Sequence, residues 1–153
     1  MLKEKVKAPE FELQDENGKV HKLSDYAGTP IVLYFYPKDN TPGCTTEACS
    51  FRDDYSAFEK ASVLILGVSV DSVKSHKKFQ EKYSLPFPLL ADVDHKVVEQ
   101  YGVWQEKKMM GKTYMGIVRT TYLIDKHGMI ARVFENVKPS EHSQEVLEAL
   151  KTL

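Results

Sequence analysis

Several features that direct a protein to a membrane, a nucleic acid or a secretory route are missing from this chain of 153 residues. No apolar run approaches the ~18 residues that a membrane span needs. Lysine and arginine (21) nearly balance aspartate and glutamate (22), and the net charge of -1 gives no reason to expect nucleic acid or an anionic membrane as a partner. The first residues lack the hydrophobic core of a signal peptide. We therefore expect a cytoplasmic protein.

Cysteine is scarce as well, because the chain has only Cys44 and Cys49. In the cytoplasm a cysteine pair is more often catalytic or redox-active than a static cross-link. A closed tetrahedral metal site needs four ligands, and no histidine lies near either cysteine in the sequence. We therefore expect catalytic or redox-active thiols and no metal or other cofactor.

Strand and helix patterns alternate along the chain without a repeat, a low-complexity tract or a linker, which predicts one α/β domain over residues 1–153. Apolar patterns indicate strands at 11–13, 20–23, 31–36, 62–70, 89–92, 121–125 and 129–134. Helices are expected after Cys44, from a cap at Asp71 to about Tyr83, from a cap at Asp94 to about Tyr101, and from Ser140. Phe51, Tyr55 and Phe58 recur at helical intervals, so we place them on one helix face. We expect a central mixed sheet with helices on both faces and an N-terminal hairpin.

Cys44 follows a strand-like run and a short loop that together predict its place at the start of a helix. The apolar residues 31–36 indicate a buried strand that stops at Pro37, and the loop ends in Thr41-Pro42-Gly43. At a helix start, unpaired backbone N–H groups and the positive end of the helix dipole stabilise an anion. This placement favours the nucleophilic thiolate over a buried, inert thiol.

Cys49 lies five residues after Cys44, a spacing that does not suit a disulfide within a regular helix. Five helical residues rise about 7.5 Å and turn about 140°, so the two Cα atoms would lie roughly 8.7 Å apart. A disulfide without backbone movement needs less than about 7 Å. Two alternatives remain: the thiols never meet, or the helix unwinds locally each time they do.

The run from Pro37 to Cys44 resembles the Pro-x-x-x-Thr-x-x-Cys active-site motif of peroxiredoxins. The position of the second cysteine, Cys49, five residues further on, resembles the bacterioferritin comigratory protein (PrxQ) subfamily in particular. The resemblance covers nearly the full chain through three further runs: Ala8-Pro9-Glu10-Phe11, Gly67-Val68-Ser69-Val70-Asp71 and Arg119-Thr120-Thr121-Tyr122-Leu123-Ile124-Asp125. Several motifs in the right order argue against a chance match.

The resemblance implies a thioredoxin-like fold and a thiol peroxidase that reduces hydrogen peroxide and organic hydroperoxides. Cys44 would be the peroxidatic cysteine, which attacks the peroxide and becomes a sulfenic acid. Cys49 would be the resolving cysteine, which condenses with Cys44 to an intramolecular disulfide. Thioredoxin or a similar dithiol protein would then reduce this disulfide. The resemblance favours a monomer, because an intramolecular pair needs no second chain.

The same resemblance implies roles for residues around the cysteine. Thr41 would hold its hydroxyl near the thiolate and the peroxide, although threonine here also suits a helix cap. Pro37 would shield the thiol from water, and it ends the strand in either case. Arg119 would supply a permanent cation that stabilises the thiolate and the charge developing on the peroxide oxygens, with Arg52 as a weaker rival. Glu47, one turn past the cysteine, would orient the arginine.

Alternatives remain for the second cysteine and for the function. Cys49 would be a packed helix residue if turnover does not require it. A disulfide oxidoreductase of the thioredoxin type usually carries Cys-x-x-Cys, and the spacing of five argues against it. A redox sensor that signals through helix unwinding also remains open, although the charge pattern indicates no dedicated partner.

One apolar segment has no assigned role in this scheme. It contains Trp104, Met109, Met110, Tyr114 and Met115, between a predicted helix and a predicted strand. We expect a loop that packs over the core. The alternative is an apolar rim for larger organic hydroperoxides.

Overall fold

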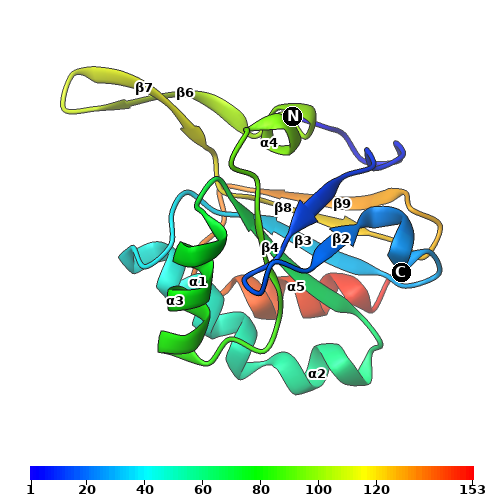
Figure 1. The fold of residues 1–153 in the computed structure, drawn as a ribbon. Coiled ribbons are helices and arrows are strands. Elements are labelled where there is room, and N and C mark those ends of the chain that lie inside the picture. The colour runs from blue at the N-terminus through cyan, green and yellow to red at the C-terminus, as the bar shows by residue number, and fades with distance from the viewer.

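A seven-stranded mixed sheet forms the centre of the protein in a computed structural model that describes residues 1–153 (Figure 1). The strands are β1 (Glu12–Gln14), β2 (Val20–Lys22), β3 (Ile31–Phe35), β4 (Leu64–Ser69), β5 (Leu89–Ala91), β8 (Thr120–Ile124) and β9 (Ile130–Glu135). Their order across the sheet is β2-β1-β5-β4-β3-β8-β9. β3, β4 and β5 are parallel, whereas β8 runs antiparallel to β3. The predicted mixed sheet and the N-terminal hairpin, β1 with β2, are confirmed.

The central strand β3 is buried on both faces, and it divides the interior into two cores. All five of its residues are buried. Because side chains alternate across a strand, Val32 and Tyr34 enter one core, and Leu33 and Phe35 enter the other. The first core also contains Cys44, so the candidate nucleophile belongs to that face of the sheet.

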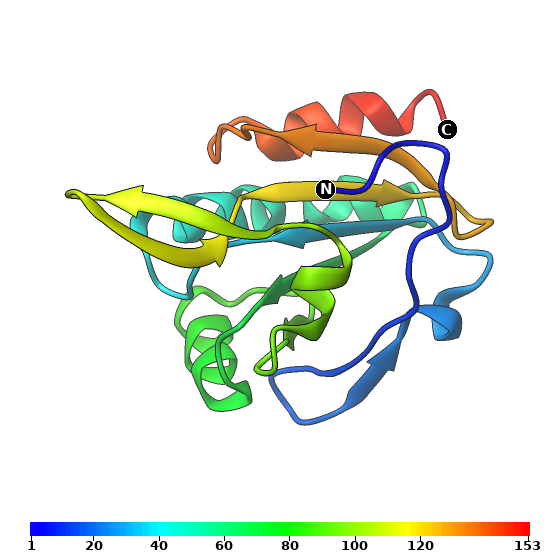
Figure 2. The same ribbon diagram turned by 90° about the horizontal axis from the view of Figure 1, so that it is seen from above.

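Helices cover both faces, as the sequence predicted (Figures 1 and 2). The first core is covered by α1 (Pro42–Asp53), α2 (Tyr55–Lys60), α3 (Val73–Tyr83) and α5 (His142–Leu150). The second is covered by α4 (Lys96–Gln100) and the N-terminal segment, with a 3-10 turn at Leu23–Tyr26 beside it. None of the helices combines the length and the apolar character that crossing a bilayer requires.

The helix starts differ from the predicted caps by one or two residues. α3 is capped by Ser72, whose hydroxyl accepts a hydrogen bond from the Ser75 N–H, and not by Asp71. The Asp71 carboxylate instead accepts a hydrogen bond from the backbone N–H of Asp39, which fastens a distant loop to the sheet. Tertiary hydrogen bonding therefore takes precedence over the local cap at this position.

The predicted cap of α4 at Asp94 is also wrong. The preceding residue of α4 is His95, in the left-handed conformation at φ 64°, and it makes no side-chain cap. Asp92, buried at the end of β5, accepts a hydrogen bond from the Val98 N–H at 2.8 Å. α5 likewise begins at His142, after Glu141, and not at the predicted Ser140.

The helix that follows Cys44 is interrupted at Asp54, where one continuous helix was predicted. The Asp54 carboxylate accepts hydrogen bonds from Ser143 and Gln144 of α5, at 2.6 and 2.8 Å. The interruption therefore lies where the chain is linked to a distant helix. Phe51 and Phe58 nevertheless pack in the same core, as their spacing predicted.

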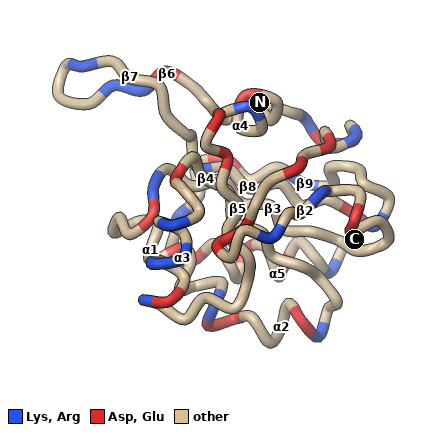
Figure 3. Tube along the Cα trace, in the orientation of Figure 1, with Lys and Arg blue, Asp and Glu red and all other residues tan.

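Residues 104–117 form a protruding ribbon, where a loop packed over the core was predicted. The strands β6 (Trp104–Met109) and β7 (Lys112–Ile117) pair antiparallel and extend away from the main sheet (Figure 2). The turn residues Met110 and Gly111 both have positive φ, 51° and 76°, as a tight hairpin turn requires. Met110 is 97% exposed, and lysines flank the turn (Figure 3). At its base, Trp104 and Ile117 pack against the second core.

Candidate active site

Cys44 occupies the first turn of α1, as predicted. Thr41 precedes the helix with an extended backbone (φ -88°, ψ 156°), and Pro42 is the first helical residue. Proline suits this position because its φ is already helical and no N–H is needed there. The Cys44 N–H is among the first helical N–H groups, which have no intrahelical acceptor. The site therefore offers a backbone donor beside the Cys44 thiol.

Arg119 reaches Cys44 through the pairing of two strands. β8 begins at Thr120, opposite Phe35 at the end of β3, so Arg119 lies at the edge from which the Cys44 loop leaves. Its Nη2 donates to Cys44 Sγ at 3.3 Å, and its Nη1 donates to Glu47 Oε1 at 2.6 Å. The guanidinium thus bridges the thiol and a carboxylate with two nitrogens of one rigid fork.

The three groups of this cluster are largely withdrawn from water. Cys44 is 1% exposed and Glu47 is 0% exposed, whereas the Arg119 side chain keeps 18% of its surface. Burial raises the pKa of Glu47 to about 7, although Arg119 acts to lower it. Burial alone would lower the pKa of Arg119, but Glu47 and Cys44 outweigh that effect and raise it. The guanidinium is therefore a fixed cation, whereas Glu47 can change charge near neutral pH.

The other predicted site residues lie around this cluster. The Thr41 hydroxyl donates to the carbonyl of Lys38 at 2.9 Å and does not cap the helix. Its oxygen lone pairs stay available to accept a further hydrogen bond. Pro37 is half-buried where β3 leads into the loop. The rival cation Arg52 lies at the other end of α1, where it donates to the carbonyl of Tyr83 at 2.8 Å.

Cys49 lies on the same unbroken helix as Cys44, and both thiols are free. Cys44 is buried, whereas Cys49 is half-exposed at a shallow hollow shared with Thr45, Asp53 and Ser140. The helix therefore keeps the regular geometry in which a five-residue separation is too long for a disulfide. A bond between the two sulfurs requires part of α1 to unwind.

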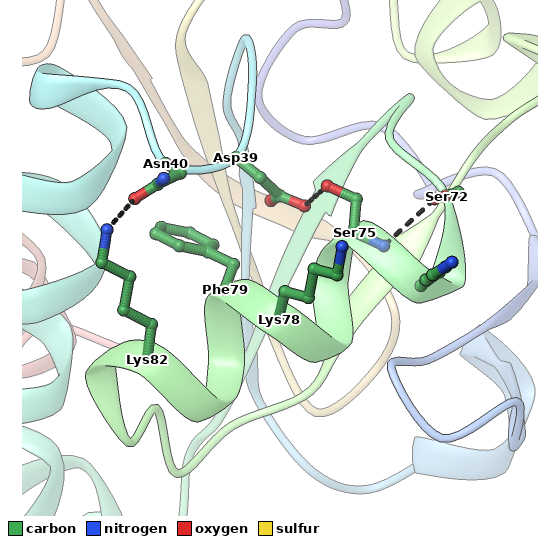
Figure 4. Close-up of a pocket in the computed structure, with 8 residues that line it drawn as sticks. Asp39, Asn40, Ser72, Ser75, Lys78, Phe79 and Lys82 are labelled. Atoms are coloured by element: carbon green, nitrogen blue, oxygen red, sulfur yellow. Dashed lines mark hydrogen bonds between the residues drawn. The ribbon is translucent and has the colours of Figure 1, made fainter.

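A buried polar network holds the loop that precedes Cys44, and sequence reasoning missed it. Asp39 accepts from the Ser75 hydroxyl at 2.8 Å (Figure 4). It also accepts from the Tyr36 hydroxyl at 2.7 Å, and His76 Nδ1 lies 2.7 Å from the same carboxylate. Asp39, Asp71 and His76 place potential ligand atoms within 4.8 Å of one another. Because these atoms are paired within the protein, the cluster serves to position the loop.

The next residue of the loop is held from α3. Asn40, at φ 61°, accepts from Lys82 Nζ and from the Tyr83 hydroxyl, both at 3.3 Å. Figure 4 shows Lys82 reaching from α3 to Asn40 across the hollow between helix and loop. Asp39 and Asn40 occupy variable positions of the sequence motif, so the motif alone contained no signal for these anchors.

Comparison with known proteins gives one consistent result. The AhpC/TSA family model matches residues 5–133. The chain is 53% identical over 147 residues to peroxiredoxin Bcp of Bacillus subtilis, covering 96% of this chain and 94% of that protein. It is 49% identical over 144 residues to peroxiredoxin Bcp of Escherichia coli, covering 94% and 92%.

Solved structures agree with the sequence relatives. A PrxQ variant from Xylella fastidiosa superimposes with a TM-score of 0.94 at 37% identity, covering 99% of this chain and 97% of that one. The bacterioferritin comigratory protein of Xanthomonas campestris, studied for its alkyl peroxide reduction activity, gives 0.88 at 42% identity, covering 93% and 90%.

Proposed function

This chain belongs to the AhpC/TSA family, among the Bcp and PrxQ peroxiredoxins, and we propose that Cys44 is its peroxidatic cysteine. The protein is a thiol-dependent peroxidase whose substrate is a peroxide and whose reductant is a thioredoxin-type dithiol. The observation that best supports the assignment is the Arg119 fork, which contacts Cys44 Sγ at 3.3 Å and Glu47 at 2.6 Å.

In the first step, the Cys44 thiolate attacks one peroxide oxygen. The S–O bond forms as the O–O bond breaks, and the leaving oxygen takes up a proton to become water or an alcohol. Arg119 and the Cys44 N–H stabilise the negative charge that moves from sulfur to the leaving oxygen. Thr41 supplies a hydroxyl beside the site, Pro37 limits access of water, and Glu47 fixes the orientation of the guanidinium.

In the second step, Cys49 resolves the sulfenic acid. Its thiolate attacks the Cys44 sulfur, a disulfide forms, and the hydroxyl leaves as water. Support for a required unwinding of α1 comes from the regular helix that carries both cysteines. A dithiol reductant then opens the disulfide by exchange, and the helix re-forms.

We further infer the setting in which this chemistry operates. The intramolecular cysteine pair supports a monomer, because it needs no second chain. Both cores lie on one sheet, which supports a single domain over residues 1–153. Basic and acidic residues are interspersed along the chain, which supports a protein without a nucleic-acid partner (Figure 3). We place this protein in the cytoplasm. The alkyl peroxide reduction studied in the Xanthomonas campestris relative supports organic hydroperoxides as substrates beside hydrogen peroxide.

Two serine variants test the roles of the cysteines. Cys44→Ser should abolish peroxide consumption, because the nucleophile is lost. Cys49→Ser should reduce one equivalent of peroxide and then stop with thioredoxin as the reductant. Mass spectrometry after one equivalent of peroxide should show two hydrogens lost in the parent protein and oxygen added in Cys49→Ser. Steady-state activity in Cys44→Ser would overturn the assignment of Cys44, and full thioredoxin-dependent turnover in Cys49→Ser would overturn that of Cys49.

A further inference from the structure

Two buried polar atoms in the molecule lack a hydrogen-bond partner, the Tyr34 hydroxyl and Glu47 Oε2. Leaving such an atom unpaired costs about 1–3 kcal/mol, so each case calls for an explanation. Glu47 belongs to the proposed peroxidase site, and Tyr34 shares a core with Cys44. We propose, resting on the proposed function, that Tyr34 is a positioning residue that acts on Cys44 through Glu47 and Arg119.

The fold makes a specific space for the hydroxyl end of Tyr34. Tyr34 is fully buried on β3 and pairs in register with Gly67 at the centre of β4. A Cβ atom at Gly67 would lie 2.9 Å from Tyr34 Cζ, the carbon that bears the hydroxyl, and 2.9 Å from Leu89 Cδ2. Glycine weakens a strand interior, and its presence there often marks a close approach. Here the residue that approaches is Tyr34.

The ring of Tyr34 is directed at the helix of the site. It packs 4.9 Å from the ring of Phe51 on α1 and 5.4 Å from the ring of Tyr36. Burial raises the pKa of Tyr34 well above its ordinary value, and Glu47 raises it further, followed by Cys44. The hydroxyl is therefore protonated and is a donor, and among charged groups Glu47 acts on it most strongly.

A donor near Glu47 matters because this carboxyl is poised to titrate. Its pKa of about 7 means that a modest interaction decides its charge at neutral pH. A water molecule that accepts from the Tyr34 hydroxyl and donates to Glu47 Oε2 would satisfy both unpaired atoms and favour the carboxylate. An ionised Glu47 keeps the Arg119 fork aimed at Cys44, whereas a neutral Glu47 releases its ionic hold on a side chain that still reaches solvent.

Two further titratable groups approach the cluster from neighbouring elements. Lys107, from β6, donates to the carbonyl of Ile117 at 2.8 Å and lies within the electrostatic range of Arg119 and Cys44. His142, from α5, also senses the charge of Arg119. Glu47 itself faces Arg119 as its charged partner, so the path from Tyr34 to Cys44 passes through that pair.

The test is the pH profile of the peroxide step in Tyr34→Phe. The rate constant for oxidation of Cys44 by hydrogen peroxide is measured by rapid mixing across neutral pH. Removing the donor raises the pKa of Glu47, so Glu47 loses its charge at a higher pH. Arg119 then stabilises the Cys44 thiolate less well, and the acid limb of the rate profile should move up by up to about one pH unit, a loss of several-fold near pH 7. Combined with Glu47→Gln, the same change should leave the profile unmoved.

Two further proteins separate positioning from packing. Tyr122→Phe is the matched control: Tyr122 is fully buried, faces the other core, and donates to the Tyr101 carbonyl, so its loss should lower stability without moving the limb. Fluorotyrosine at position 34 keeps the packing and strengthens the donor, so the limb should move down. A uniform rate loss in Tyr34→Phe at every pH, an unmoved limb with fluorotyrosine, or an equal shift in the Glu47→Gln background would overturn the proposal. Failure of the proposed function itself would appear as peroxide reduction by the parent protein that does not need Cys44.

Discussion

At the residue scale, Glu47 is a group whose charge costs the folded state stability. Its carboxyl is fully buried, and one of its two oxygens has no partner. Burial raises its pKa from 4.5 to about 7, so between these values the native protein holds a proton that the unfolded chain has released. Stability therefore falls as the pH rises through this interval, and the cost is complete above the folded-state pKa.

Replacing Glu47 with glutamine should reverse this cost. Glu47→Gln keeps the shape and cannot ionise, so it should be more stable than the parent above about pH 7, by up to about 3 kcal/mol, and lose this advantage below about pH 4.5. The peroxide step should slow, because Arg119 loses its ionic anchor. Urea unfolding at both ends of the interval measures the first effect, and rapid mixing measures the second.

The exposed glutamate Glu59 on α2 supplies the control for this experiment. Glu59→Gln should leave both the pH dependence of unfolding and the peroxide step unchanged. A stability gain in Glu47→Gln that is the same at every pH would contradict the explanation from burial.

Residues of the site differ in how far sequence could identify them. The family resemblance predicted that Cys44, Glu47 and Arg119 form one site, and in the structure Arg119 contacts both of the other side chains. Tyr34 stands inside an apolar run and is indistinguishable there from any core aromatic residue. Its unpaired hydroxyl is a property of three-dimensional neighbours, so no local pattern could predict it.

At the scale of elements, α1 has two requirements that conflict. It must be a regular helix to hold Cys44 in its first turn, and it must open for Cys49 to reach the oxidised sulfur. Gly43 serves both requirements. A Cβ atom there would lie 3.1 Å from Arg119 Nη2, and glycine also lowers helix stability at the entrance of α1.

Gly43→Ala should therefore slow both chemical steps. The added methyl group crowds the guanidinium, which weakens peroxide reduction several-fold. The gain in helix propensity, about 1 kcal/mol, opposes unwinding and should slow disulfide formation about fivefold. Rapid mixing, with separate detection of the sulfenic acid and the disulfide, resolves the two rates.

Thr46→Ala separates the two causes. Thr46 is an exposed helix residue whose hydroxyl donates to the Pro42 carbonyl, whereas the guanidinium of Arg119 bonds Glu47 and Cys44. Its replacement should raise helix propensity and slow only disulfide formation. A peroxide step that is unaffected in Gly43→Ala would show that the guanidinium tolerates the added methyl group.

Elements were predictable where the chain's own pattern decides them, and not where distant contacts do. The strands with continuous apolar runs were found because burial on both faces leaves a plain signal. The break at Asp54 depends on hydrogen bonds to Ser143 and Gln144, which are far away in the sequence. The sequence predicts a loop where the β6–β7 ribbon forms, because the exposed apolar side chains of this segment do not alternate with a buried face.

At the scale of the whole molecule, strand order brings the site together. Arg119 meets Cys44 only because β8 lies beside β3. The sequence pattern predicts the strands but not which strands pair. Only the family resemblance therefore predicted the contact between Arg119 and Cys44. The same order leaves one core beneath α1 and the other on the opposite face.

The two cores allow a comparison between helix packing and global stability. Phe51 lies on α1 in the core that contains Cys44, 5.8 Å from the ring of Phe58. Phe35 lies on β3 in the other core, 5.3 Å from the ring of Tyr101. Both side chains are fully buried, so replacement of either by leucine should cost roughly 1–3 kcal/mol of unfolding free energy.

Only one of these replacements should change catalysis per folded molecule. Phe51→Leu loosens the docking of α1, which raises the population of the unwound helix and should speed disulfide formation after oxidation. Phe35→Leu weakens the fold as a whole but leaves the contacts of α1 intact, so its rate of disulfide formation should match that of the parent. Rates are measured by rapid mixing well below the melting temperature of each variant. Equal acceleration in both would mean that global stability, and not the packing of α1, controls the opening that lets Cys49 reach Cys44.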